Sequence, residues 1–379
     1  MLPNNPIWDE GPSPSFPPLA GDADTDLCVV GLGGTGLAAA RQALDLGLRV
    51  VAIDRGRVAG GAAGRNGGLL LAGVAAFYHD AVASLGRDRA RRLYECTLEE
   101  LDRFLEETPE AVRRVGSLRL ATTPEEEEDC LRHLALLRED GLPASDYRGP
   151  EGVGLLIPSD GAFNPMARCR QLAARLAERG ARLHEGTAAV AIGPGAVQTA
   201  GGTIRAGIVV VAADGRLADL VPALAPRIRT ARLQMLATAP DPGIRIPRPV
   251  YARYGMEYWQ QLPGGEVALG GFRDLGGVEE WTHADTPTPA IQDALEDLLR
   301  NGLRVTAPIT HRWGASVSYT DGDLPILAEV QPGVWAMGAY NGTGNLVGPL
   351  CARAAVQLAA GRPSELGELL GAARWNPAA

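Results

Sequence analysis

The residues best suited to chemistry are three closely spaced glycines and an acid that follows them. Gly31, Gly33 and Gly36 form a GxGxxG pattern between a short apolar run and an Ala/Leu-rich segment, and Asp54 ends the next apolar run. This is the order of a dinucleotide-binding βαβ unit, in which the backbone approaches a pyrophosphate and the acid accepts hydrogen bonds from a ribose. The free amides at the start of the helix attract the phosphates. The pattern predicts a dinucleotide site within residues 26–54.

Two further glycine-rich segments could complete such a site. Residues 55–68 follow the acid directly, and their glycines allow the backbone to pass close to a ligand. Arg65 and Asn66 in this loop can donate hydrogen bonds to a phosphate or to a polar ring edge. A flexible linker is the alternative, but the position of the loop directly after the acid favours a second cofactor contact. Residues 342–345 precede another Ala/Leu-rich segment and predict a second helix N-terminus for electronegative ligand atoms.

The chain lacks several residue types that other mechanisms require. It contains no lysine, so all 36 basic residues are arginine, and this excludes a Schiff-base lysine and a Walker lysine. The five cysteines form no CxxC pair and are expected to be reduced and mostly buried. The acidic run 125–129 has no histidine at ligand spacing, so we interpret it as a solvated helix face and expect no metal site.

Composition limits the class of protein. With 379 residues, of which 46% are hydrophobic, the chain can bury a large core and is expected to form two domains. The net charge of −9 argues against a nucleic-acid partner. The N-terminal sequence has no signal-peptide pattern, and no apolar run reaches the roughly twenty residues of a membrane span. We therefore expect a cytoplasmic protein without a membrane partner.

Periodicity predicts the elements that position these motifs. Two buried strands complete the β/α alternation of a mainly parallel sheet. Strand-like runs separated by turns predict an antiparallel sheet in a second domain, and a last strand precedes the 342–345 turn. Residues 1–24 are interpreted as an extended arm with Trp8 and Phe16 as anchors, with disorder as the alternative. The helices are expected at 87–107, 124–139, 165–178, 289–300 and 346–360, the buried strands at 188–192 and 208–215, the antiparallel strands at 116–121, 232–238, 249–258, 266–274 and 310–319, and the last strand at 333–340.

The motifs together resemble those of the FAD-dependent amine oxidases of the D-amino-acid oxidase superfamily. The resemblance rests on the GxGxxG unit, the 61–68 loop, the 270–274 segment, residues 320–325 and the 342–345 turn. It covers nearly the whole chain, and the order of the motifs is more specific than any one of them. The 61–68 loop is most similar to that of the γ-glutamylputrescine oxidase branch.

The resemblance implies an α/β fold in which a Rossmann-type FAD-binding domain is interleaved with a substrate domain built on a mostly antiparallel sheet. The implied division is an N-terminal arm (1–25), an FAD-binding domain (26–115, 160–225 and 323–379) and a substrate domain (116–159 and 226–322). It also implies non-covalent FAD, with the backbone of Val190 against the adenine. The implied cofactor-binding residues are Gly31, Gly33, Gly34, Thr35, Gly36, Asp54, Arg55, Arg65, Asn66, Gly67, Gly68, Val190, Ala212, Gly342, Thr343, Gly344 and Asn345.

The implied chemistry is hydride transfer from an amine-bearing carbon to the flavin, followed by hydrolysis of the imine. Related amino-acid oxidases use an arginine on the strand that corresponds to 313–319, but in this chain that strand has no arginine after Arg312. A simple α-amino acid substrate therefore requires Arg273 or Arg253 to reach the site. Related sarcosine oxidases use a lysine to activate oxygen, so its absence makes a dehydrogenase with another electron acceptor more credible.

Five side chains on the expected substrate sheet are candidates for facing the substrate. Aromatic rings can enclose an amine, and an arginine can bind a carboxylate through two hydrogen bonds. A core or rim position is the alternative for each. We expect an enzyme that oxidises an amine or amino acid with oxygen or another acceptor, and the alternative is a flavoprotein with a structural or sensory role. The candidates are Tyr254, Tyr258, Arg273, Trp313 and Tyr319.

Overall fold

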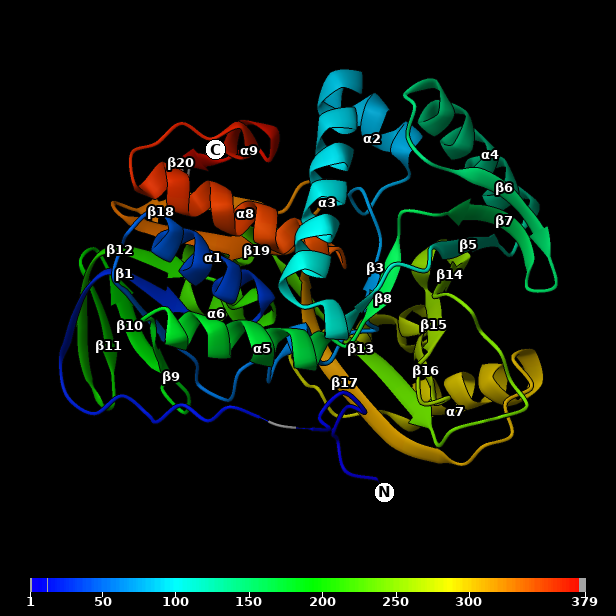
Figure 1. The fold of residues 1–379 in the computed structure, drawn as a ribbon, viewed down its shortest axis with the longest axis horizontal. Helices are drawn as coiled ribbons and strands as arrows, with labels where there is room; N and C mark the ends of the chain where they lie inside the picture. Colours follow the sequence, from blue (N-terminus) through cyan, green and yellow to red (C-terminus); the bar gives the residue numbers. More distant parts are fainter. Residues whose placement is uncertain (1, 12, 375–379) are drawn as a thin grey trace. The chain divides into compact units, whose positions relative to one another are not determined.

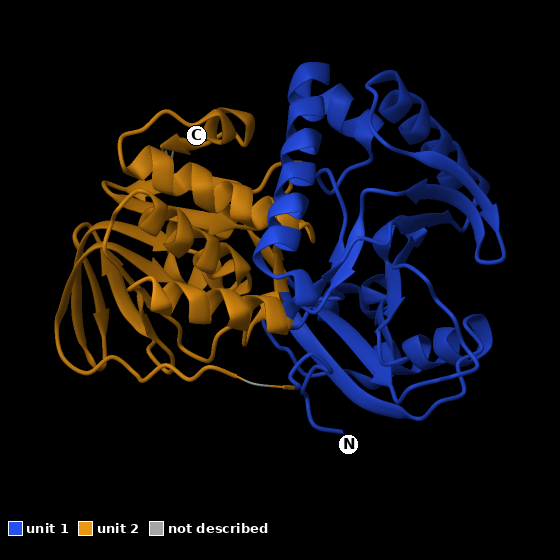
Figure 2. Cartoon of the chain, in the orientation of Figure 1, with its two compact units in different colours: residues 1–10, 65–165, 231–316 blue, residues 11–64, 166–230, 317–379 orange. Residues whose placement is uncertain are grey.

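A computed structural model of the protein describes residues 2–11 and 13–374. Contacts divide the chain into two compact units, each assembled from three segments (Figure 2). Unit 1 comprises residues 1–10, 65–165 and 231–316, and unit 2 comprises residues 11–64, 166–230 and 317–379. The segment 65–115, predicted with the cofactor domain, lies in unit 1, because its helices pack against others of that unit.

Unit 2 is built on a mixed sheet in which β1 pairs in parallel with β2 and β12. Helices α1 and α8 pack on β1, β12 and β19 (Figure 1). In spatial order the strands are β20 (Ala373–Arg374), β18 (Ile326–Gln331), β19 (Val334–Gly338), β12 (Gly202–Val211), β1 (Ala23–Val30), β2 (Val50–Ile53) and β9 (Arg182–His184). Outside this order, β11 (Ala196–Thr199) pairs with β12, and β10 (Ala189–Gly193) pairs with β11. The helices are α1 (Gly34–Asp45), α5 (Pro165–Glu178), α6 (Leu217–Leu220), α8 (Gly344–Ala359) and α9 (Glu365–Leu369).

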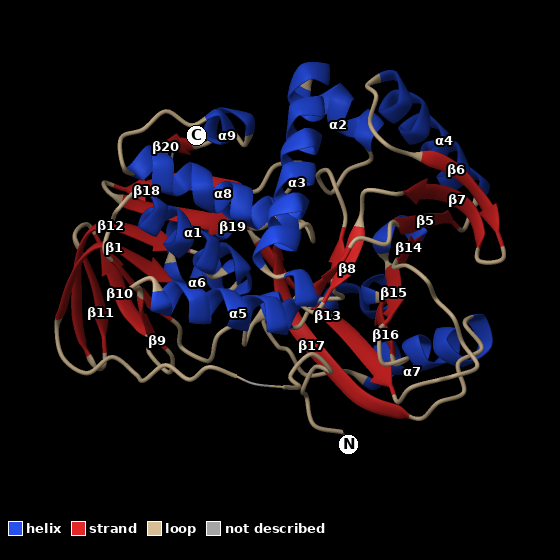
Figure 3. Cartoon of the chain, viewed as in Figure 1, coloured by secondary structure: helices blue, strands red, loops and turns tan. Residues whose placement is uncertain are grey.

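Unit 1 is built on a mostly antiparallel sheet, within which β14 and β5 pair in parallel (Figure 3). In spatial order its strands are β17 (Ile309–Tyr319), β13 (Arg229–Thr238), β16 (Val267–Gly271), β15 (Glu257–Gln261), β14 (Val250–Ala252), β5 (Ser117–Ala121), β7 (Gly152–Ile157) and β6 (Ser145–Gly149). A small sheet joins β3 (Leu69–Leu70), β8 (Gly161–Phe163) and β4 (Val112–Arg113). The helices are α2 (Tyr78–Leu85), α3 (Arg87–Glu107), α4 (Pro124–Glu139) and α7 (Pro289–Asp297).

The two faces of the larger sheet of unit 1 contact different cores. Leu118 and Leu120 of β5 join a core with α7, because alternate residues of a strand point to the same face. The opposite face meets a second core that includes Tyr94 of α3, Leu134 of α4 and Leu155 of β7. Ser117 and Arg119 of β5 therefore point toward the side of α2, α3 and α4.

Several predicted elements are confirmed with their bounds, notably the helices at 87–107, 124–139 and 165–178. Trp8 of the predicted arm is an anchor, since its side chain is only 1% exposed. The strand predicted at 188–192 is present as β10, but its predicted burial is wrong, because β10 forms an exposed hairpin with β11, and Val190 is 72% exposed.

Three other predicted elements end early. The predicted strand 249–258 breaks after Ala252, because Arg253 and Tyr254 take positive φ values of 50° and 52° in a tight turn. The strand predicted at 266–274 ends at Gly271, and Arg273 begins a 3₁₀ segment. In the helix predicted at 289–300, α-helical geometry ends at Asp297 and a π-helical turn continues to Gly302.

Candidate functional site

The GxGxxG loop of unit 2 is packed so tightly that two of its positions require glycine. Gly31 has φ of +113°, and a Cβ atom there would lie 2.4 Å from the carbonyl oxygen of Ala212. At Gly36 a Cβ atom would lie 1.8 Å from the carbonyl oxygen of Gly31. At Gly34, by contrast, a Cβ atom would meet nothing within 4 Å, so this backbone faces open space. The loop thus packs closely on β12 and α1 while its outer side is free for a ligand.

Asp54 ties this loop to the segment that follows β2. Its Oδ2 accepts a hydrogen bond from the amide of Leu32 (2.8 Å), and its Oδ1 accepts one from the amide of Gly56 (2.7 Å). Burial raises the pKa of the Asp54 carboxyl, although these two amides and the neighbouring Arg55 act to lower it. Each carboxylate oxygen has a second lone pair, so both can still accept a ribose hydroxyl.

The N-termini of α1 and α8 meet within unit 2. A Cβ atom at Gly348, in α8, would lie 2.3 Å from the Oγ1 atom of Thr35, in the first turn of α1. Neither helix has a side-chain cap or an acidic residue in its first turn. The Thr343 hydroxyl, which precedes α8, donates to the carbonyl of Tyr340 (2.7 Å). Two uncapped helix starts therefore offer amide groups and partial positive charge to an anion.

Asp214, which the sequence reasoning missed, fixes the turn before α8. It lies just beyond the carboxyl end of β12, and its Oδ1 accepts from the amide of Ala339 (2.9 Å) while its Oδ2 accepts from that of Ser318 (3.3 Å). Burial raises the pKa of Asp214 to about 6, and these backbone hydrogen bonds act against that rise. The signal was present, because ligand loops follow the carboxyl ends of parallel strands.

In unit 1, the loop 65–68 is fixed through its carbonyl groups. Nε1 of the fully buried Trp313 donates to the carbonyl oxygen of residue 65 (2.8 Å), and Nε1 of Trp8 donates to that of residue 66 (2.8 Å). Nε2 of Gln260 donates to the carbonyl oxygens of residues 67 and 68 (2.8 and 2.9 Å). The loop therefore has a defined backbone path, and Trp313, predicted to face the substrate, lies in the core and anchors it.

The side chains of this loop also make internal contacts. Nε of Arg65 donates to the carbonyl of Gly314 (2.7 Å) and its Nη2 to that of Asn4 (2.9 Å). Burial lowers the pKa of the Arg65 guanidinium. Oδ1 of Asn66 accepts from the amide of Gly68 (2.9 Å). Arg65 thus fastens the loop to neighbouring backbone, and its contact with a cofactor stays a prediction.

Tyr258 on β15, another of the predicted substrate-facing residues, also lies against this loop. A Cβ atom at Gly67 would lie 2.8 Å from its ring, and one at Gly270 would lie 2.4 Å from it. Tyr254 is 45% exposed, and its hydroxyl donates to Asp129 of α4 (2.9 Å). The two glycines therefore make room for the Tyr258 ring, whereas Tyr254 lies on the surface.

The remaining predicted residues lie elsewhere. The guanidinium of Arg273 stacks on the ring of Trp281, 4.8 Å from its centroid. Tyr319, at the end of β17, belongs to unit 2 and is half-buried. Within unit 1 the structure thus brings Tyr258 to the loop, but it does not gather Tyr254 and Arg273 around it.

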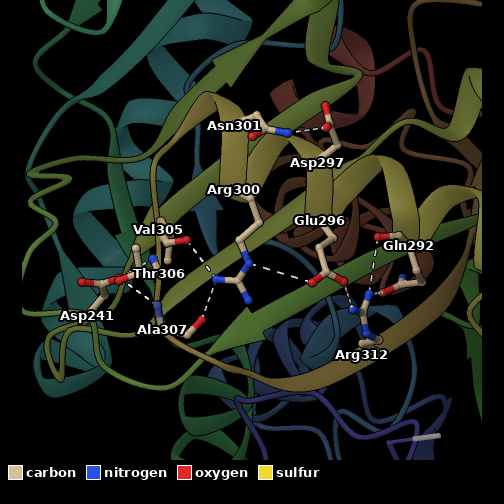
Figure 4. A network of polar contacts seen from close by, with 10 residues as sticks. All are labelled: Asp241, Gln292, Glu296, Asp297, Arg300, Asn301, Val305, Thr306, Ala307 and Arg312. Atoms are coloured by element: carbon tan, nitrogen blue, oxygen red, sulfur yellow. Dashed lines mark hydrogen bonds and ion pairs between the residues drawn. The ribbon is translucent and has the colours of Figure 1, made fainter.

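Two arginines that could have bound a carboxylate are already paired. On β17, Arg312 donates to Glu296 (2.5 Å) and to Gln292 (3.0 Å) of α7, within a larger polar network (Figure 4). Arg253 contacts Glu257 (2.7 Å) and also forms two hydrogen bonds with Asp274 (2.8 and 2.9 Å). Neither guanidinium is therefore free for a ligand.

A different arginine, also missed from the sequence, lies in the same row of the sheet as Tyr258. Cross-strand pairing places Arg119 of β5 opposite Tyr251 of β14, and Tyr251 opposite Tyr258. Arg119 lines a small cavity together with Tyr251 and the buried Asp160. The clue was an arginine between Leu118 and Leu120 in an otherwise apolar strand, because such a residue faces away from the core of its neighbours.

The described part of the chain holds neither a candidate metal centre nor a candidate membrane-spanning helix. In residues 2–11 and 13–374, no group of His, Cys, Asp and Glu side chains is arranged to hold a metal ion. No helix in these same ranges combines the length and apolar character that crossing a membrane would require.

Sequence comparison places the chain among flavin-dependent oxidoreductases. The family described as FAD dependent oxidoreductase matches residues 26–358. The chain is 28% identical over 384 residues to the probable oxidoreductase OrdL of Rhizobium meliloti, covering 93% of this chain and 87% of the relative. It is 28% identical over 372 residues to gamma-glutamylputrescine oxidoreductase of Escherichia coli, covering 89% and 84% of the two chains.

Structural comparison gives the same fold. Glycine oxidase from Geobacillus kaustophilus has a TM-score of 0.73 at 22% identity and covers 90% of this chain and 96% of its own. L-proline dehydrogenase from P. horikoshii has a TM-score of 0.75 at 21% identity, with 92% and 96% coverage. The predicted α/β class with a mostly antiparallel second sheet is confirmed.

Proposed function

The chain belongs to the FAD dependent oxidoreductase family, and we propose that it oxidises the carbon–nitrogen bond of an amine or amino acid. The resemblance to the D-amino-acid oxidase superfamily noted in the sequence is confirmed, as are the oxidoreductase class and FAD as the cofactor. The substrate, the electron acceptor and the side chains that face the substrate belong to the proposal.

The residues of unit 2 fit an FAD cofactor. The glycine loop leaves its outer side open at Gly34, and two uncapped helix starts lie together at Thr35 and Gly348. Asp54 retains acceptor capacity for a ribose. We assign the pyrophosphate to the Gly31–Gly36 loop and the ribose to Asp54. We assign the flavin end to the 342–345 turn, with FAD bound non-covalently, and we retain the 65–68 loop of unit 1 as a predicted cofactor contact.

When bound, FAD would supply a hydride acceptor; loss of a hydride from the carbon bearing a neutral amine gives a protonated imine, which water hydrolyses. The protein has to orient that carbon and exclude alternative poses. Tyr258 is suited to this, because its ring is fixed between Gly67 and Gly270 and offers an apolar face to an alkyl amine. Arg273 and Tyr319 stay candidates for the rim of the site.

The observation that carries the proposal is the placement of the Tyr258 ring directly on the 65–68 loop, with Tyr251 beside it on the next strand. The similarity to a gamma-glutamylputrescine oxidoreductase, whose name states an amine substrate, supports it. The test is anaerobic mixing of the purified yellow protein with a panel of amines and amino acids. Bleaching of the flavin by some amine is the expected result, and a flavin that no member of the panel reduces would contradict it.

The electron acceptor is a second question for the same experiment. Because the chain has no lysine to activate oxygen, we propose that an acceptor other than oxygen is used. Admitting air to the reduced protein, in parallel with an artificial quinone acceptor, separates the two cases. Rapid reoxidation by air would establish an oxidase. A flavin that no amine reduces would favour the structural or sensory alternative.

A further inference from the structure

A small cavity with a mixed polar and apolar lining lies within unit 1, next to Tyr251, which pairs across the strands with Tyr258. Its volume is about 30 Å³, which is room for about two water molecules or one carboxylate group. The residues around it include Ser117 and Arg119 of β5, Tyr94 of α3, Tyr251 of β14 and Asp160. These groups come from separate elements and converge on one point, as they would in a binding site.

Arg119 is the unusual member of this cavity. Its guanidinium carbon lies 4.4 Å from the ring centroid of Phe77 and 5.3 Å from that of Tyr251. Among the residues that the structure describes, it makes no hydrogen bond and no ion pair. Asp160, which shares the cavity, instead accepts from Ser117 Oγ (2.6 Å) and from the amide of Ala72 (2.9 Å). A half-buried guanidinium with two aromatic contacts and unused donors is prepared for an anion.

The other arginines on this sheet have partners of their own. Arg312 and Arg253 are paired with carboxylates, and Arg232 of β13 forms two hydrogen bonds with Glu280 (2.9 and 2.7 Å). Arg113, in the small sheet, donates to Gln260 (3.1 Å). Arg119 is therefore the arginine of this group whose donors await a ligand.

We propose that Arg119 binds a carboxylate at the far end of the substrate, remote from the carbon–nitrogen bond that is oxidised. This inference rests on the proposed function and names its substrate class: an amine that carries a distant carboxylate. Tyr258 lies on Gly67, and Arg119 lies two strands away in the same row. At about 4.8 Å per strand, the separation is about 10 Å, which is too long for an α-carboxylate.

The geometry also explains how such a substrate is oriented. Its alkyl chain would run across the ring faces of Tyr258 and Tyr251, and its carboxylate would enter the cavity and meet the guanidinium. The planar guanidinium can donate two parallel hydrogen bonds to a carboxylate, and the Tyr94 hydroxyl makes no hydrogen bond to the described residues and can add a third.

The test compares Arg119→Leu with the wild type on matched substrates. γ-Aminobutyrate, δ-aminovalerate and ε-aminocaproate carry a carboxylate at increasing distance, and n-alkylamines of equal length lack it. In the wild type, KM should fall as the carboxylate moves further away. In the variant, KM should rise roughly 10- to 100-fold for the longest amino acid and stay within about twofold for the alkylamine. Calorimetric titration of the holoenzyme with hexanoate, which cannot be oxidised, should show binding that the variant loses.

Controls separate a binding role from a structural one. Arg148→Leu, on the outer strand β6, removes an exposed arginine (58% exposed) paired with Glu127 and should alter none of these values. Arg119→Gln keeps a polar, hydrogen-bonding side chain without the charge, so it decides the question if the leucine variant does not fold. Arg119→Lys keeps the charge and should recover part of the hexanoate affinity.

Other outcomes would overturn the inference. If Arg119→Leu raises KM equally for the amino acids and the alkylamines, Arg119 only supports the fold. If hexanoate binding is lost in Arg273→Leu and not in Arg119→Leu, the carboxylate site lies at Arg273 instead. If no amine reduces the flavin but hexanoate still binds through Arg119, the proposed function fails and the anion site stands. If amines reduce the flavin but a distant carboxylate does not change KM, the anion site is refuted and the proposed function stands.

Discussion

Replacing Asp160 by asparagine should make the protein more stable at alkaline pH and remove part of its pH dependence. The carboxyl is only 3% exposed, and burial raises its pKa from 3.8 to about 7, against the hydrogen bond from Ser117 and the charges of Arg119 and Arg114. The folded state therefore retains a proton that the unfolded chain has already released. This proton difference lowers stability progressively as the pH rises from about 4 to about 7.

The magnitude follows from the two pKa values. Each tenfold change in proton affinity corresponds to about 1.4 kcal/mol, so a rise from 3.8 to about 7 amounts to about 4 kcal/mol above neutral pH. In Asp160→Asn the amide oxygen can still accept from Ala72, and the amide nitrogen can donate to Ser117 Oγ. The variant should match the wild type near pH 4 and exceed it by several kcal/mol at pH 8.

Urea unfolding of both proteins at a series of pH values measures this difference directly. Other groups, including Asp214, titrate in the same range, but they contribute equally to both proteins and cancel in the difference. A stability difference that is the same at pH 4 and pH 8 would refute the reasoning. It would mean that the carboxyl is ionised in the cavity at all these pH values, with Arg119 or water supplying the missing solvation.

Three further predictions concern the cofactor site and its supports. Asp54→Ala should raise the Kd for FAD roughly 100-fold, because hydrogen bonds from a ribose to a charged acceptor are lost, and unchanged flavin retention on dialysis would discredit the ribose assignment. Gly36→Ala should yield protein purified without flavin, because its Cβ atom would lie 1.8 Å from the carbonyl oxygen of Gly31, and a normal yellow colour would show that the turn can adjust. Trp313→Phe removes the 2.8 Å hydrogen bond to the Arg65 carbonyl and should lower the free energy of unfolding, measured with urea, by about 1–2 kcal/mol. An unchanged free energy of unfolding would show that water replaces the lost donor.

Local patterns in the sequence were sufficient for the cofactor half of the molecule. The glycine loop and Asp54 lie within one βαβ unit, so their spacing alone predicts their arrangement, and β1, α1 and β2 confirm it. The helix over 124–139 begins at Pro124 after the capping Thr123, which is a signal that needs no tertiary information. Helical periodicity was equally sufficient for α3.

The substrate half could not be predicted in the same way. Arg119, Tyr251 and Tyr258 become neighbours only through the register of β5, β14 and β15, which no short pattern encodes. The turn at Tyr254 depends on a positive φ in a residue type that rarely adopts one. Gln260 gave no signal either, although it fixes two carbonyls of the 65–68 loop, because a glutamine on a strand is ordinarily a solvent-facing residue.

This difference has a physical cause that bears on function. In the proposed site the cofactor is bound largely by backbone amides at helix starts and by glycines, whose positions are set by local geometry, so relatives with different substrates can share them. The substrate is expected to meet side chains instead, and two exchanges, one on β17 and one on β5, are enough to move a charge between these strands. Arg312 is paired with Glu296, whereas Arg119 has no such partner among the described residues. Our proposal on the amines that this enzyme accepts therefore rests on the place of the unpaired arginine more than on the family fold.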